Sequence, residues 1–254
     1  MRKGYGMLEQ NIQQRMDNYW NDRAKTYGEQ NRGQLKNQLR NRWKQLILKM
    51  APKNRSLNIL DIGTGPGFFA ILMAEEGHQV TAIDMNGNML IEAKKNAKGY
   101  ETQIQFLQVG ETLPFQDESF DLVISRDVTW TLPFPENTMK HWFSKVKSGG
   151  WMLYFDANWY AYLKDEQEYK AYKRYRQYVE ANDGFTYEKF DELEKIAYEL
   201  PMTYRKRPEW DFEFWSNEGI TNIVCQENLN NEIYTLKEQL QYAKQPEFLV
   251  YIQK

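Results

Sequence analysis

Cysteine and histidine are scarce in this chain of 254 residues, which has one Cys and two His. The lone Cys225 excludes an internal disulfide and argues against a zinc site, which usually takes several thiolate or imidazole ligands. No apolar run approaches the roughly 18–20 residues that cross a membrane, and the first six residues lack the apolar region of a signal peptide. We therefore expect a cytoplasmic protein with no membrane span and no bound metal.

Charge of the two signs is almost balanced over the whole chain, but it is not evenly distributed. Residues 1–55 hold 13 Lys and Arg against 4 Asp and Glu, and the remainder holds 20 against 31. The apolar residues of the basic segment recur at helical spacing: Leu35, Leu39, Trp43, Leu46, Ile47 and Met50. We interpret the segment as a basic helical region packed on an acidic body. An arm that binds nucleic acid is the alternative.

Residues 58–69 read Asn-Ile-Leu-Asp-Ile-Gly-Thr-Gly-Pro-Gly-Phe-Phe, an apolar run followed by an acid and three glycines. This pattern predicts a strand that turns tightly into a helix. Because glycine has no Cβ, such a turn leaves backbone N–H groups open to a ligand that approaches closely. The spacing Gly-x-Gly-x-Gly differs from the Gly-x-Gly-x-x-Gly pattern of dinucleotide-binding proteins.

A second acid, Asp84, ends the segment Gln79-Val-Thr-Ala-Ile-Asp, which reads as the next strand. The helix between the two strands should span residues 68–76 and end at Gly77. A carboxylate at this place in a strand-helix-strand unit is suited to accept hydrogen bonds from both hydroxyls of a ribose.

With these two acids and the glycine loop, the chain resembles the class I S-adenosylmethionine-dependent methyltransferases. Their first motif is an acid before Gly-x-Gly-x-Gly, and their second is an acid that ends the next strand. The resemblance continues through Leu113-Pro-Phe-Gln-Asp-Glu-Ser-Phe-Asp and Lys147-Ser-Gly-Gly-Trp, so it covers residues 55–156. It is broadest with the small-molecule type, which includes methyltransferases of quinone and small-metabolite biosynthesis.

The resemblance implies an α/β fold with a Rossmann-like, seven-stranded, mostly parallel sheet, helices on both faces and an antiparallel last strand. We expect the strands near residues 57–62, 79–84, 103–109, 120–125, 150–156, 220–226 and 247–253.

Three regions follow from this fold. Residues 1–55 would form an N-terminal helical lid, with helices at 8–30 and 33–50. Residues 56–156 and 209–254 would form the cofactor-binding core. Residues 157–208, inserted after the fifth strand, would form a helical substrate cap. Tyrosines recur every third residue in that cap, and because they spread over half the helix circumference we expect most of them to be packing residues: Tyr169, Tyr172, Tyr175 and Tyr178.

The resemblance also implies the cofactor, S-adenosylmethionine, with S-adenosylhomocysteine as the product, and it assigns contacts to them. The loop around the methionine part and the ribose would be formed by Asp61, Gly63, Thr64, Gly65 and Gly67. Asp84 would hold the ribose hydroxyls and Met85 would pack on the adenine. Gly110, Glu111 and Arg126 complete the set of residues expected in the core part of this site.

Val109 departs from the family pattern. Many relatives carry an Asp at this position, and its carboxylate receives the adenine amino group. Here Glu111, a backbone carbonyl or a water molecule would have to take that role. The backbone N–H of Gly110 can still reach the ring.

Two clusters of polar and aromatic residues follow the fourth and fifth strands, where open α/β sheets bind their ligands. In the first, Asp127 would be a catalytic base or would bind an ammonium group, with a helix cap or a structural acid as the alternative. Trp130 would face the acceptor or belong to the core. In the second, Asp156 is the other catalytic candidate. Asn158, Trp159 and Tyr160 are the remaining acceptor contacts. The aromatic faces of Trp159 and Tyr160 suit a cationic or planar molecule.

The segment Tyr19-Trp-Asn-Asp-Arg-Ala-Lys-Thr-Tyr27 resembles one that folds over the bound cofactor in many relatives. Tyr19, Trp20 and Tyr27 would face the cofactor, or else anchor the first helix. His78 and His141 lie outside the expected path of the methyl group. Without a histidine base, an amine or thiol acceptor is favoured over an alcohol.

We therefore expect a methyltransferase that acts on a small-molecule acceptor, an amine, thiol or hydroxyl, by in-line displacement. One alternative is a tRNA or protein methyltransferase that uses the basic N-terminal region, and another is a non-catalytic protein that only binds the cofactor. The Asn/Asp-Pro-Pro-Tyr/Phe signature of enzymes that methylate nucleic-acid bases is absent, which argues against nucleic acid as a partner. We expect a monomer or a homodimer.

Overall fold

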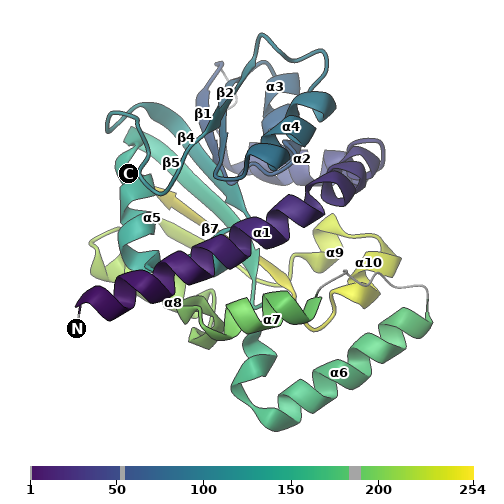
Figure 1. Ribbon diagram of the computed structural model, residues 1–254. Helices are drawn as coiled ribbons and strands as arrows, with labels where there is room; N and C mark the ends of the chain where they lie inside the picture. Colours follow the sequence, from purple (N-terminus) through teal and green to yellow (C-terminus); the bar gives the residue numbers. More distant parts are fainter. Residues whose placement is uncertain (1, 52–54, 183–189) are drawn as a thin grey trace.

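A seven-stranded sheet forms the centre of the protein (Figure 1), and the computed structural model describes residues 2–51, 55–182 and 190–254. The strands are β1 (Asn58–Ile62), β2 (Gln79–Asp84), β3 (Ile104–Gln108), β4 (Phe120–Arg126), β5 (Val146–Ala157), β6 (Ile223–Gln226) and β7 (Glu247–Gln253). Their order is β3-β2-β1-β4-β5-β7-β6, and β7 runs antiparallel to both of its neighbours. The predicted fold class is confirmed.

The central strands form because their sequences are apolar on both faces. Six of the seven residues of β4, all but Arg126, are buried, and so are the last four residues of β1. Parallel strands covered by helices on both sides read as continuous apolar runs of this kind. β5 is longer than predicted, since it begins at Val146, whereas β6 is shorter and begins only at Ile223.

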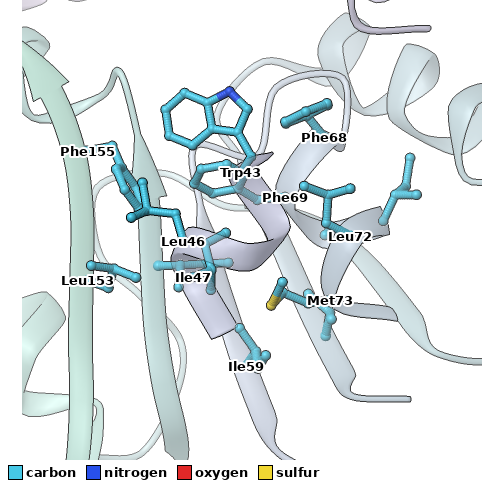
Figure 2. Packing of buried hydrophobic residues seen from close by; sticks show 14 of the residues in the cluster. Trp43, Leu46, Ile47, Ile59, Phe68, Phe69, Leu72, Met73, Leu153 and Phe155 are labelled. Atoms are coloured by element: carbon cyan, nitrogen blue, oxygen red, sulfur yellow. The ribbon is translucent and has the colours of Figure 1, made fainter. Parts of the chain in front are cut away.

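Helices cover both faces of the sheet. On one face, α2 (Leu39–Met50) and α3 (Phe68–Glu75) bury an aromatic and aliphatic cluster against the strands, with Trp43, Phe69 and Phe155 in edge contact (Figure 2). On the other face, α5 (Pro135–Ser144) and α8 (Glu209–Asn217) contribute Trp142 and Trp215. α4 (Gly87–Asn96) packs beside β2 and β3.

The first helix is longer than expected. α1 (Arg2–Leu35) continues through Gly33, so the predicted boundary between helices at 8–30 and 33–50 was wrong, and α2 begins only at Leu39. Figure 1 shows α1 as one long rod across the molecule, where it packs on α4 and α7. Within the segment predicted as a lid, α2 therefore belongs to the core, and only α1 lies outside it.

The region after β5 is helical, as predicted. It contains η2 (Ala161–Lys164), α6 (Glu166–Ala181), α7 (Phe190–Tyr198) and η3 (Pro201–Tyr204), and Figure 1 places α6 well away from the sheet. Two short helices between β6 and β7, α9 (Asn230–Ile233) and α10 (Leu236–Gln241), were not predicted. A further short helix, η1 (Thr129–Thr131), follows β4. No helix in the described ranges has the length and apolar character that a membrane crossing requires.

Candidate functional site

The loop after β1 is built around three glycines with positive φ, at +65° for Gly63, +52° for Gly65 and +86° for Gly67. A side chain is rarely stable in this left-handed region. At Gly63 there is also no space, because an added Cβ would lie 2.3 Å from Cγ2 of Val128. The glycines are therefore needed for the shape of the turn and for its close approach to the segment after β4.

Asp61 stabilises this loop through a hydrogen bond with Thr64. Its side chain is buried, and its Oδ2 accepts a hydrogen bond of 2.6 Å from the Thr64 hydroxyl. Burial raises the pKa of Asp61 to about 7, although the hydrogen bond from Thr64 and the charge of Arg126 oppose the rise. Asp61, Thr64 and Gly67 line neither of the two cavities described below, whereas Gly63 and Gly65 line one of them.

Asp84, at the end of β2, ties the next turn to the glycine loop. Its Oδ2 accepts the N–H of Gly65 at 2.8 Å and its Oδ1 accepts the N–H of Asn86 at 2.8 Å. Burial raises the pKa of Asp84 to about 6, and these backbone hydrogen bonds limit the rise. The carboxylate is thus held at the edge of the sheet where β1, β2 and β4 all end.

A cavity of about 190 Å³ opens beside this carboxylate, and we call it the glycine-loop cavity. Its lining includes seven of the residues predicted to contact the cofactor in the core: Gly63, Gly65, Asp84, Met85, Gly110, Glu111 and Arg126. Among the described residues, four acids line it, Asp17, Asp84, Glu111 and Asp127, against the single arginine, and give it a negative character.

The end of this cavity near β3 is apolar where relatives carry an acid. Val109 lines the cavity, and its N–H donates to the carbonyl of Asp84 at 3.0 Å. Met85 lines the same cavity and is exposed, and its carbonyl accepts a hydrogen bond from Gln108. A planar ring in this part of the cavity would have apolar contacts from Val109 and Met85, with Glu111 as an acid within the same cavity.

A second cavity, of about 160 Å³, lies between the sheet edge, α1 and the cap, and we call it the aromatic cavity. Eleven aromatic side chains line it, among them the predicted acceptor contacts Trp130, Trp159 and Tyr160. Of the four tyrosines of α6, most of which were expected to be packing residues, Tyr172 and Tyr175 also line this cavity, and Tyr178 is exposed. Tyr19 was expected to face the cofactor. It lines only this second cavity, because its ring is on the side of α1 that faces the cap.

The two cavities meet at four residues that line both of them: Trp20, Tyr27, Arg126 and Asp127. The ring centroids of Trp20 and Tyr27, about two turns apart along α1, are separated by 5.8 Å. Arg126 ends β4 with its guanidinium over the rings of the α2–α3 cluster, 4.8 Å from the Phe68 centroid. A molecule in one cavity can therefore touch a molecule in the other only at these residues.

Asp127 has an unusual backbone and an unusual side chain. Its φ of +59° is left-handed, which is rare outside glycine and often found at functional sites. The Asp127 N–H donates to the carbonyl of Phe155, which holds the turn in place. Its Oδ2 lies 3.6 Å from Nε of Arg126, and its Oδ1 has no hydrogen-bond partner among the described residues. Burial raises the pKa of Asp127 to about 7 against the charge of Arg126, with a smaller contribution from Asp156.

Asp156 does not occupy the catalytic position predicted for it. Its side chain is fully buried, lines neither large cavity, and forms an ion pair with Arg207 at 3.1 Å. Its two oxygens also accept hydrogen bonds from Trp130, Ala157 and Trp159. A carboxylate with all of these partners anchors the cap to the sheet and has no free face for an acceptor.

Asn158 is likewise structural, because its amide donates to the Arg207 carbonyl at 2.7 Å and it lines neither large cavity. Both histidines lie outside the two cavities, as expected. Nδ1 of His78 accepts the Leu57 N–H, and Nε2 of His141 accepts the Leu113 N–H.

Several residues that line the aromatic cavity were not predicted from the sequence. Arg23 and Arg176 line the aromatic cavity, as do Tyr234 and Gln245 from the segment between β6 and β7. Arg207, which neutralises Asp156, was also missed. The Arg23 position follows from its place in the Tyr19–Tyr27 segment, but no sequence signal marks the others, because they reach the site only through the folding of distant segments.

Comparison with known proteins agrees with this architecture. Residues 60–154 match the family model described as "Methyltransferase domain". The tRNA 5-carboxymethoxyuridine methyltransferase of Escherichia coli (strain K12) is 30% identical over 143 residues, 53% of this chain and 54% of that protein. The ubiquinone biosynthesis O-methyltransferase of Albidiferax ferrireducens is 33% identical over 103 residues, 39% of this chain and 41% of that protein. The chain spans about half the length of the curated relatives it matches.

A solved structure shares the fold over a longer range. Phosphoethanolamine N-methyltransferase 2 of Haemonchus contortus, solved in complex with S-adenosyl-L-methionine, superposes with a TM-score of 0.60 at 20% identity. The superposition covers 84% of this chain and 52% of that one. At this identity the likeness concerns the fold. The domain match over residues 60–154 agrees with the family predicted from the glycine loop and Asp84.

Proposed function

Residues 60–154 of this chain are a methyltransferase domain of the S-adenosylmethionine-dependent class, and on that basis we propose that the protein methylates a small-molecule acceptor. The observation that carries the proposal is the junction of two cavities at Asp127. One cavity has the glycine loop and Asp84, and the other has aromatic walls.

The residues of the glycine-loop cavity fit the cofactor. S-adenosylmethionine is a cation at its sulfur, and Asp17, Asp84 and Glu111 supply negative charge around the cavity. Asp84 is already fixed by two backbone N–H groups, so it can accept further hydrogen bonds from ribose hydroxyls without reorganising. Met85 and Val109 offer apolar contact to the adenine, and Glu111 is the acid that can receive its amino group.

When bound, S-adenosylmethionine supplies a methyl group that its sulfonium already activates for in-line displacement by an acceptor. The chain's own residues therefore mainly position the acceptor and exclude water. Trp20 and Tyr27 line both cavities where they meet. Asp127 stands there with a partly exposed side chain and takes the proton that a hydroxyl, thiol or amine acceptor releases.

α1 would act as the lid over this arrangement. It contributes residues to both cavities, from Gln13 and Asp17 on one side to Gln30 and Gln34 on the other. α1 is therefore placed to contact both ligands.

Methylation of tRNA is the second candidate, because one relative is a tRNA methyltransferase. The charges of this chain do not favour it. Several basic residues of α1 and α2 form ion pairs with acids of the protein body, such as Arg15–Glu199, Arg32–Glu92 and Lys44–Glu76. An RNA-binding surface requires arginines and lysines that can release counterions from phosphates.

Transfer of tritium from labelled S-adenosylmethionine separates these functions. The protein is incubated in turn with dialysed cellular protein, with total tRNA, and with the metabolites that pass the dialysis membrane. We expect label in the metabolite fraction only, and none with Asp127→Asn, which should still bind S-adenosylhomocysteine in calorimetry. Label in tRNA would overturn the small-molecule proposal. Tight cofactor binding with no label in any fraction would indicate a non-catalytic binding protein.

A further inference from the structure

The two adjoining cavities have opposite charge. The glycine-loop cavity is lined by four acids, Asp17, Asp84, Glu111 and Asp127, and one arginine. The aromatic cavity is lined by three arginines, Arg23, Arg126 and Arg176, and by a single acid, Asp127, among the described residues. A cationic donor suits the first cavity. By the same argument, the second suits a molecule with a negative charge.

Arg176 contributes positive charge to the lining of the aromatic cavity. It comes from α6, and its guanidinium carbon lies 3.7 Å from the centroid of the Phe190 ring. Its ion pair with Glu180, at 3.8 Å, is longer than a hydrogen bond, and Glu180 does not line the cavity. A guanidinium stacked on a ring keeps the N–H groups of its edge for a planar anion such as a carboxylate.

The size of the aromatic cavity is sufficient for an aromatic ring. An apolar cavity of about 150 Å³ binds benzene, and the aromatic cavity has about 160 Å³. One ring with small substituents therefore fits within it. Its walls are themselves rings, such as Trp130 and Tyr160 at 5.0 Å from each other, and these favour a flat occupant.

An aromatic cavity of this kind also attracts cations in other proteins, through the negative faces of the rings. Here the arginines oppose that reading. Arg176 lies over Phe190, so it already covers a ring face that a ligand cation could use. A protonated amine would in addition meet a net positive lining.

We propose that the aromatic cavity binds an acceptor with a single aromatic ring and one negatively charged substituent, which Arg176 holds at the cap side while the atom to be methylated lies near Asp127. This inference rests on the proposed function in one respect, because the occupant is an acceptor only if the glycine-loop cavity holds the methyl donor. The charge and size preference of the cavity stands independently of turnover.

Three probes of equal ring size test the charge preference: benzoate, benzyl alcohol and benzylamine. Each is titrated into the protein saturated with S-adenosylhomocysteine, and binding is followed by ligand-observed NMR. We expect benzoate to bind at least tenfold more tightly than benzylamine, with benzyl alcohol between them. Equal or tighter binding of benzylamine would overturn the proposal, and so would the absence of benzoate binding.

Two variants of α6 locate the anion. Arg176→Met should weaken benzoate at least tenfold and leave benzyl alcohol unchanged. Arg174→Met removes an exposed arginine of the same helix that does not line the cavity, so it should change neither. Equal effects of the two variants on benzoate would overturn the role of Arg176. Affinity for S-adenosylhomocysteine is measured first in the wild type and in both variants. If the wild type does not bind it, the proposed function is contradicted. If the wild type binds it but shows no preference for benzoate over benzylamine, only the present inference is contradicted.

Discussion

Asp127 is the residue at which the account of catalysis can be tested most simply. Its side chain must be ionised to accept a proton, and burial raises its pKa to about 7. Turnover should therefore rise with pH through about 7 and level off above it. Asp127→Asn should lower kcat by roughly 10²–10⁴, the usual contribution of a general base, and abolish this pH dependence. An unchanged pH–rate profile in the variant would show that another group titrates.

Substitution of Gly63 tests whether the glycine loop requires both the positive φ of this residue and its close contact with Val128. Gly63→Ala forces a Cβ to within 2.3 Å of Val128 at a φ of +65°, so we expect a loss of about 1–3 kcal/mol in the free energy of unfolding. Gly33→Ala is the matched control. It lies in a helix with no atom within 4 Å of the added Cβ, and should stabilise by about 0.5–1 kcal/mol. Urea unfolding measures both, and a destabilisation of equal size in the two variants would refute the argument.

Asp61 predicts a pH dependence of stability. Its pKa is about 7 in the folded protein and about 3.9 in an unfolded chain, so the folded state binds the proton more tightly. The resulting contribution to stability is complete below pH 4 and is lost as the pH rises to 7. Asp61→Asn cannot ionise and should lose less stability between pH 5 and 8 than the wild type does. Parallel curves of melting temperature against pH for the two proteins would contradict this.

At the scale of elements, the ion pairs around Arg207 attach the cap to the sheet. Arg207 is buried and donates to Asp156 of β5 and to both oxygens of Asp211 in α8. Arg207→Met leaves two buried carboxylates without their cation, which should cost roughly 3–5 kcal/mol in the free energy of unfolding.

Arg205→Met is the control for this change. Its pair with Glu136 is about 40% exposed on both sides, and its loss should cost about 0–1 kcal/mol. Chemical denaturation compares the two variants. Similar costs would mean that the buried cluster does not hold the cap in place.

The elements most visible in the sequence were those with a strong local pattern. The apolar runs of β1, β2 and β4 and the glycine turn after β1 were predicted almost to the residue. The break predicted at residues 31–32 was wrong, because α1 continues to Leu35 and packs against α4 and α7. The helices between β6 and β7 carry no such pattern, since α9 is a four-residue element fixed by its place on the sheet.

The same distinction applies to the site. Residues in the strand-end motifs, such as Gly65 and Asp84, could be predicted because the local turn brings them to the cavity. The role expected for Asp156 was wrong because its partner, Arg207, is 51 residues away and no local signal pairs them. Arg176 and Tyr234 join the aromatic cavity only once the cap and the C-terminal segment fold back over the sheet.

At the scale of the whole molecule, charge is arranged in two ways. The basic α1 and α2 form ion pairs with acids of the core and cap, as the interpretation of a basic helical region on an acidic body requires. Inside the molecule, an acidic cavity adjoins a basic one at Arg126 and Asp127. Such a pair of cavities suits a reaction between a cationic donor and an anionic acceptor.

The central claim is that the methyl donor occupies the glycine-loop cavity and faces the aromatic cavity. A crystal structure with S-adenosylhomocysteine bound tests it most directly. We expect the ribose hydroxyls on Asp84, the adenine between Val109 and Met85, and the sulfur at the junction beside Asp127, facing the aromatic rings. A sulfur atom directed away from that junction, or a ligand bound outside the glycine-loop cavity, would contradict the account.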